Sequence, residues 1–158
     1  MDRKSQTGFI IYYGSTPIAW VSRKQRAVSL STTDAEMRAA TEACKEIIII
    51  RRLLAFLGLP QDGPTPLLED NSAVVTVTND KAKQNSNRLK YMEVRDKWVN
   101  ECCNRVGIVE VVKCPTDKQV ADLLTKTMTN VEKFEALREL LYRPMELKVM
   151  MEDMKIEQ

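Results

Sequence analysis

The feature that most constrains the fold is one long amphipathic stretch between Thr33 and Gly58. Thr33 and Glu36 match the S/T-x-x-E capping box that begins helices, and glycine is a typical residue just beyond a helix end. The pattern predicts a helix of about 24 residues. The apolar residues of its repeating face stand at positions 40, 43, 47, 50, 54 and 57.

The segments around this helix predict strands before it and an alternation of strands and helices after it. Residues 8–14 and 18–22 are rich in β-branched and aromatic residues and flank a Gly-Ser-Thr-Pro turn, and residues 27–30 favour a third short strand. The later elements follow in order: a buried strand at 67–70, a segment at 71–78 that fits a strand or a short helix, a basic loop at 81–90, a helix at 91–105, a strand at 107–112, and helices at 120–128 and 131–141.

A hairpin followed by alternating elements indicates an α/β fold with a mixed sheet flanked by helices. The chain has 158 residues, a length that suits one domain with a real apolar core. We expect this domain to cover residues 1–142. The remainder, 143–158, is a charged, methionine-rich tail that we expect to be a loose helix or disordered.

Composition excludes several classes of protein. The chain has no histidine, which excludes histidine-dependent hydrolysis and histidine-ligated zinc or haem. The four cysteines show no C-x-x-C spacing, so we expect reduced, packed thiols in an intracellular protein. The longest aliphatic run, residues 47–50, is far shorter than the ~20 residues of a membrane span, so no membrane partner is expected.

Three carboxylates stand where a predicted strand ends or a predicted helix begins: Glu36, Asp70 and Asp122. Such positions can converge at one edge of a sheet, where two Mg²⁺ ions about 4 Å apart would activate a water for attack on a phosphodiester. Each residue also has a structural interpretation, because carboxylates cap helices and stabilise their first turns. Spacing alone favours the structural interpretations.

Seven blocks of the sequence change that balance, because they follow one another in the order of a known family. In them the chain resembles the ribonuclease H domain of the Pol polyproteins of copia-type (LTR) retrotransposons, from Asp2 to about Leu141. The blocks are D-R-K-S-Q-T-G at 2–8, P-I-A-W-V-S-R-K-Q at 17–25, L-S-T-T-D-A-E at 30–36, D-N at 70–71, K-Y-M-E-V-R at 90–95, C-P-T-D-K-Q-V-A-D-L-L-T-K at 114–126, and F-x-x-L-R-x-x-L at 134–141.

The resemblance implies a ribonuclease H-like fold that hydrolyses the RNA strand of RNA–DNA hybrids during reverse transcription. In that family four carboxylates bind two Mg²⁺ ions, with Mn²⁺ as an alternative. Three of the four positions correspond to Glu36, Asp70 and Asp122 here, as catalytic and metal-binding residues. Asp34 is the fallback for Glu36, and both cannot face one site because adjacent helical residues point about 100° apart.

The chain also departs from the family. The family's first aspartate lies on a strand upstream of the first block, and Asp2 belongs to the block itself, so that role is not carried onto Asp2. We therefore expect a domain truncated at its N-terminus, without the first, central strand of the sheet. The edges of that strand's two neighbours would then be unpaired. The isolated chain is expected to be inactive or nearly so, which leaves its status as an enzyme open.

Two alternatives involve no catalysis. One is a retrotransposon relic or co-opted module that binds nucleic acid or protein, and the other is a structural connection domain of a reverse transcriptase. The resemblance implies the hybrid and the reverse transcriptase portion of the same polyprotein as partners, in a cytoplasmic particle or the nucleus. Trp20 and Trp98 are interpreted as core residues. The candidate phosphate-binding residues are Arg23, Lys24, Arg26, Lys81, Lys83, Arg88 and Lys90.

Overall fold

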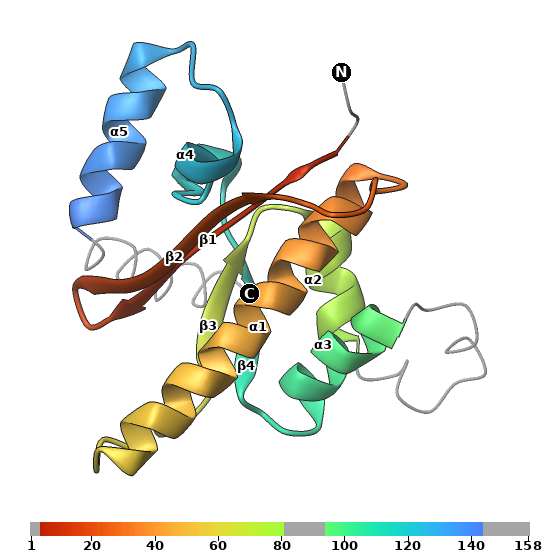
Figure 1. Cartoon of the computed structure of the whole chain (residues 1–158), viewed down its shortest axis with the longest axis vertical. Coiled ribbons are helices and arrows are strands. Elements are labelled where there is room, and N and C mark those ends of the chain that lie inside the picture. The colour runs from red at the N-terminus through yellow and green to blue at the C-terminus, as the bar shows by residue number, and fades with distance from the viewer. Residues whose placement is uncertain (1–3, 81–93, 144–158) are drawn as a thin grey trace. The chain divides into compact units, whose positions relative to one another are not determined.

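The computed structural model describes residues 4–80 and 94–143, which form two compact units (Figure 1). The first unit combines the chain up to Ser29 with the chain from Cys114 onward, and the second runs from Leu30 to Lys113. Each unit contains one two-stranded sheet with helices. The predicted loop at 81–90 and the tail from 144 lie outside the described residues.

The first unit begins with an antiparallel hairpin of β1 (Gln6–Tyr13) and β2 (Thr16–Lys24). Side chains alternate along β1, so Phe9 and Ile11 are buried while their neighbours are more exposed. Gly14 occupies the turn at φ +58°, a conformation that suits glycine. Both predicted strands of the hairpin are confirmed.

Among its described residues, the first unit also contains three helical segments: η3 (Thr116–Lys118), α4 (Asp122–Thr125) and α5 (Val131–Tyr142). Helix α4 lies against β1 at Gly8, where an added Cβ would come within 2.5 Å of Thr125 Cγ2. The helix predicted at 120–128 is wrong in extent, because Lys126 adopts an extended backbone and ends α4. The helix predicted at 131–141 is confirmed.

The second unit begins with the long predicted helix, α1 (Thr32–Phe56). Its buried stripe includes Met37, Cys44 and Ile47. The predicted capping box is wrong: the N-cap is Ser31, whose hydroxyl accepts a hydrogen bond from Asp34 N at 3.0 Å. The helix begins at Thr32, so its N-cap residue stands two positions before Thr33.

The sheet of the second unit pairs β3 (Thr65–Glu69) with β4 (Val109–Lys113) in parallel. The crossover between them contains α2 (Ser72–Asn79) and α3 (Val94–Asn104), and α1 packs beside both helices (Figure 1). The ambiguous segment at 71–78 is thus a helix, and Asn71 caps it through hydrogen bonds from Ala73 N and Val74 N. The strand at 107–112 and the helix at 91–105 are confirmed within the described residues.

The described fold is mixed α/β, as predicted, but its strands do not form one mixed sheet. They form two separate two-stranded sheets, and none of them pairs with a strand of the other sheet. The prediction of a third strand is wrong. Residues 27–30 form no strand, and Leu30 there is 88% exposed. Gln25 holds the start of this segment in a bend, because its side chain accepts a hydrogen bond from Ser29 Oγ at 2.7 Å.

The prediction of reduced, packed cysteines is confirmed for three of the four, and the prediction that both tryptophans lie in the core is wrong for Trp20. None of the four cysteines forms a disulfide, and three of them, Cys44, Cys102 and Cys114, are buried. Trp20 is 65% exposed, whereas Trp98 is partly buried. Because side chains alternate along a strand, Trp20 lies on the opposite face of β2 from the more buried Ala19 and Val21.

Candidate functional site

Two of the three predicted carboxylates lie in the second unit and approach a third. Glu36 is in the first turns of α1, and Asp70 directly follows β3. The third is Glu69, the last residue of β3, whose pKa is raised by the negative charges of both Glu36 and Asp70. The start of α1 and the end of β3 therefore lie close enough for these carboxylates to act on one another, and the roles expected for Glu36 and Asp70 stay predictions.

Glu69 is the most unusual ionisable group of this site. It is only 6% exposed, and its Oε1 accepts a hydrogen bond from Asn71 N at 2.9 Å. The pKa of Glu69 is raised to about 7, chiefly by burial; the Asn71 N–H and Lys113 act to lower it, and the negative charges of Glu36 and Asp70 add to the rise. The site thus contains one carboxyl group that titrates near neutrality.

Polar contacts fix the backbone around these carboxylates. Lys113, at the end of β4, donates a hydrogen bond from Nζ to the backbone oxygen of Asp70. Asn71 Nδ2 lies 3.5 Å from Thr33 Oγ1 and links the cap of α2 to the first turn of α1. Glu69 is not among the residues predicted from the sequence, although its position beside Asp70 near the end of a predicted strand is a signal that points to it.

The geometry separates Glu36 from its fallback, Asp34. Arg38 donates hydrogen bonds to both Asp34 oxygens at 3.1 Å, and Leu30 N donates to Asp34 Oδ2 at 3.0 Å. Asp34 is thus engaged in the cap and an ion pair of α1. Of the two, Glu36 is the residue near Glu69.

The third predicted carboxylate, Asp122, lies in the first unit at the start of α4 and is 4% exposed. Lys126 Nζ is 2.8 Å from Asp122 Oδ1, and Lys133 Nζ is 3.4 Å from Asp122 Oδ2. Both carboxylate oxygens therefore have an ammonium partner. Sequence reasoning missed the two lysines.

These residues do not fit a metal centre as they stand. No set of three or more His, Cys, Asp or Glu side chains within residues 4–80 and 94–143 could hold a metal ion. Asp122 in particular already has two cationic partners. Glu36, Glu69 and Asp70 form an acidic group in the second unit, in which the charges of Glu36 and Asp70 raise the pKa of Glu69.

The basic candidates divide into those that are described and those that are not. Arg23, Lys24 and Arg26 are exposed at the end of β2 and in the segment after it. This exposure is compatible with contacts to phosphates. The other four candidates, Lys81, Lys83, Arg88 and Lys90, lie outside the described residues.

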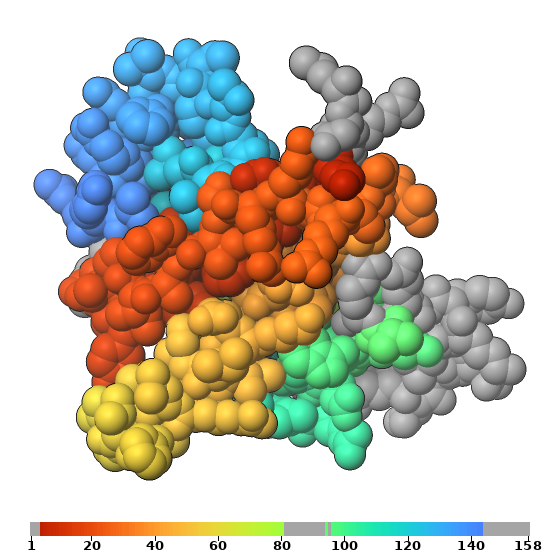
Figure 2. Space-filling model, viewed as in Figure 1, coloured from red at the N-terminus to blue at the C-terminus, as the bar shows by residue number. Residues whose placement is uncertain are grey.

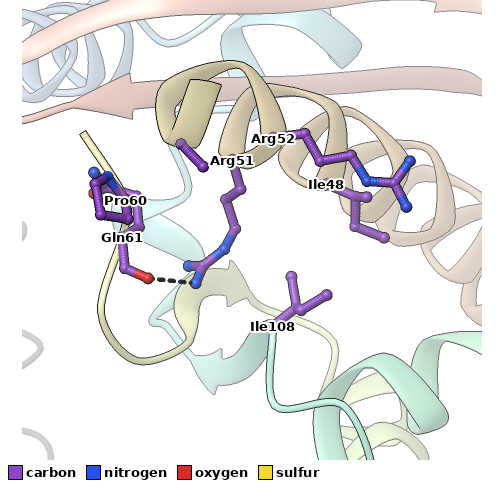
Figure 3. Close-up of a pocket in the computed structure, with 7 residues that line it drawn as sticks. Ile48, Arg51, Arg52, Pro60, Gln61 and Ile108 are labelled. Atoms are coloured by element: carbon purple, nitrogen blue, oxygen red, sulfur yellow. Dashed lines mark hydrogen bonds between the residues drawn. The ribbon is translucent and has the colours of Figure 1, made fainter. Parts of the chain in front are cut away.

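A second feature of this unit is a pocket at the far end of α1, with a volume of about 250 Å³ (Figure 3). Arg51 crosses it and donates hydrogen bonds to Gln61 O at 2.8 Å and Thr65 Oγ1 at 2.9 Å. Arg51 lies fifteen residues beyond Glu36, about 22 Å along the helix axis, so the pocket is separate from the carboxylates. Its lining residues are Ile48, Arg51, Arg52, Ala55, Pro60, Gln61 and Ile108.

The last turns of α1 near this pocket expose apolar side chains. This end of the helix is the yellow part of the surface in Figure 2. Phe56 is 87% exposed, and four other large apolar residues of this region are about half exposed. The apolar end of α1 is defined by Ile49, Leu53, Phe56, Leu57 and Leu59. Across the described part of the chain, no helix has both the length and the apolar character needed to cross a membrane.

Comparison with known proteins finds similar sequences in transposons. The chain is 36% identical over 140 residues, 89% of its length, to the "Retrovirus-related Pol polyprotein from transposon TNT 1-94" of Nicotiana tabacum. It is 32% identical over 82% and 81% of its length to the corresponding polyproteins from transposons RE2 and RE1 of Arabidopsis thaliana. The aligned region spans 10%, 9% and 8% of these three relatives. No protein-family model and no solved structure matches the chain.

Proposed function

Homologues of this chain are retrovirus-related Pol polyproteins of transposons, and from this premise we propose that it is the ribonuclease H segment of a copia-type Pol polyprotein. The activity of the parent polyprotein segment is hydrolysis of the RNA strand of an RNA–DNA hybrid during reverse transcription. The reverse transcriptase portion of the same polyprotein is its proposed neighbour. Its proposed location is a cytoplasmic particle or the nucleus.

The observation that carries this proposal is the approach of Glu36 and Asp70 in the second unit, at the start of α1 and the end of β3. Both influence the buried carboxyl group of Glu69, so like charges gather at one place in the fold. Such a group is unfavourable unless something compensates it, and nuclease sites use this arrangement to hold Mg²⁺ or Mn²⁺. Glu36 and Asp70 lie in two of the seven sequence blocks, and the blocks together support the same assignment.

We propose that the isolated chain binds the RNA–DNA hybrid but does not hydrolyse its RNA strand. A metal centre would need a further carboxylate beside Glu36 and Asp70, and Asp122 is paired with Lys126 and Lys133. Binding would use phosphate and 2′-OH contacts, which do not need the metal. Arg23, Lys24 and Arg26 are the described residues proposed for it.

The second candidate is a non-catalytic module that binds nucleic acid and never hydrolyses it. The ion pairs of Asp122 favour this candidate, because a carboxylate with two ammonium partners is a poor ligand for a divalent cation. Both candidates predict hybrid binding, so hydrolysis by a longer protein is what separates them.

A cleavage assay with a fluorescent RNA strand in an RNA–DNA hybrid tests the nuclease assignment. The 158-residue chain is compared with a longer protein that includes the reading frame preceding residue 1 in its gene, in Mg²⁺ and in Mn²⁺. We expect cleavage by the longer protein only, and its loss in Asp70→Asn. A longer protein that binds the hybrid without cleaving it would establish the non-catalytic module. Cleavage by the 158-residue chain that disappears in Asp70→Asn would overturn the expected inactivity.

Fluorescence anisotropy measures the binding itself. Replacing Arg23, Lys24 and Arg26 by alanine should weaken binding and lower the slope of log K against log salt by about 2–3. The matched control removes three cations of the second unit, Lys45, Arg52 and Arg105, and should leave the slope nearly unchanged. Equal effects of the two triple variants would refute the assignment of this basic segment.

A further inference from the structure

Asp122 has the surroundings of a structural ion-pair centre. Its side chain is 5% exposed, and each of its two oxygens faces one lysine ammonium, Lys126 at 2.8 Å and Lys133 at 3.4 Å. One negative charge is thus surrounded by two positive charges. A divalent cation brought to this carboxylate would meet both ammonium groups at short range, which is strongly unfavourable.

The backbone holds both lysines close to the carboxylate. Lys126 N donates to Asp122 O at 2.9 Å and closes the single turn of α4. Lys133 N donates to Asn130 Oδ1 at 2.9 Å, which anchors Lys133 in the first turn of α5. One ammonium group therefore comes from the residue that ends α4 and the other from the first turn of α5, and a hydrogen bond holds the backbone of each lysine.

We propose that the ammonium groups of Lys126 and Lys133 occupy the positions that a metal ion would take at Asp122. This carboxylate then joins α4 to α5 and is not a metal ligand in this chain. The consequence reaches the hairpin of the same unit. Helix α4 contacts β1 at Gly8, and Ser22 Oγ of β2 donates to Leu124 O at 2.7 Å. Asp122 thus positions α5 relative to the hairpin through α4. The inference does not depend on the nuclease assignment.

The sign of a stability change separates the two roles of Asp122. In a cluster of carboxylates without metal, replacing one aspartate by asparagine relieves repulsion and leaves the Tm unchanged or higher. In an ion-pair centre the same change leaves two ammonium groups without their shared anion, and the Tm falls. We expect Asp122→Asn to lower the Tm of the full chain by about 3–6 °C, a range reduced because both lysines are partly exposed.

Asp70→Asn is the matched control, since it is the same substitution beside Glu36 and Glu69. It should leave the Tm unchanged or raise it. A Tm for Asp122→Asn at or above that of the unmodified chain would overturn the proposal.

Three further measurements complete the test, and the last two remain decisive if Asp122→Asn fails to fold. In a cycle with Lys133→Met, the double variant should lose less than the sum of the two single losses, because the partners act on each other. If only the lysine variants fold, Lys133→Met and Lys126→Met should each lower the Tm, and no change in either would refute the ion pairs.

Titration of the unmodified chain with Mn²⁺ at constant ionic strength should give no saturable rise in Tm. A saturable rise that Asp122→Asn or either lysine variant alters would establish a metal ligand instead.

Discussion

At the scale of single residues, the buried carboxyl group of Glu69 makes the stability of the chain depend on pH. Its pKa is about 7 in the folded protein and about 4.3–4.5 in an unfolded chain. Because the pKa is raised on folding, the folded state holds the proton more tightly. The stabilisation is fully present below about pH 4.5 and is lost as the pH rises through 7.

Glu69→Gln should remove this dependence, because glutamine keeps an oxygen for Asn71 N–H and carries no charge. At pH 8 we expect the free energy of unfolding to rise by about 1–3 kcal/mol, with little change at pH 4.5. Urea unfolding at the two pH values measures it. Glu135→Gln, an exposed substitution on α5, is the control. An equal pH effect in both variants would contradict the prediction.

The residue scale also shows what the sequence could reveal about the site. Glu36 and Asp70 were predictable because strand ends and helix starts meet at a sheet edge. The partners of Asp122 were not, because Lys133 is eleven residues away and belongs to a different helix. Spacing within one helix gives Lys126 as a neighbour of Asp122. It cannot tell whether a lysine ammonium group or a metal ion faces the carboxylate.

At the scale of the elements, the start of α1 is a testable point of disagreement between pattern and structure. Ser31 caps the helix, whereas the capping-box pattern favours Thr33. Ser31→Ala should lower the free energy of unfolding by about 1 kcal/mol, because Asp34 N loses its acceptor. Thr33→Ala should cost less, since the threonine makes only a 3.5 Å contact with Asn71. Chemical denaturation of both variants measures the difference. A larger loss of unfolding free energy in Thr33→Ala would show that Thr33, and not Ser31, caps the helix.

The long periodic elements were predictable and the short ones were not. Helix α1 repeats its apolar face over many turns, so several independent positions support it. Residues 27–30 have strand propensity, but Gln25 and Ser29 bond within the segment and no described strand pairs with it. Residues 71–78 have valines typical of a strand, yet the cap from Asn71 and the packing of α2 against α3 make them a helix.

At the scale of the whole molecule, the apolar end of α1 predicts self-association of the isolated chain. Large exposed apolar patches promote contacts between molecules. Phe56→Glu should reduce association, measured by light scattering against concentration, and should change the Tm little because Phe56 is 87% exposed. Arg52→Gln lowers the net charge by the same amount as Phe56→Glu and serves as the control. Equal reductions in both variants would attribute the effect to net charge and contradict the prediction.

The division into two units also has a consequence for the order in which the chain is made. The second unit is one continuous segment, but the first is built from both ends of the chain, and Tyr12 donates a hydrogen bond to Leu141 O across 129 positions. A two-stranded hairpin alone is marginally stable in water, and contacts this distant form slowly. On the ribosome, a nascent chain that has reached Lys113 therefore contains every described element of the second unit. At that point the hairpin, although synthesised earlier, has no partner yet, because α4 and α5 have not been made.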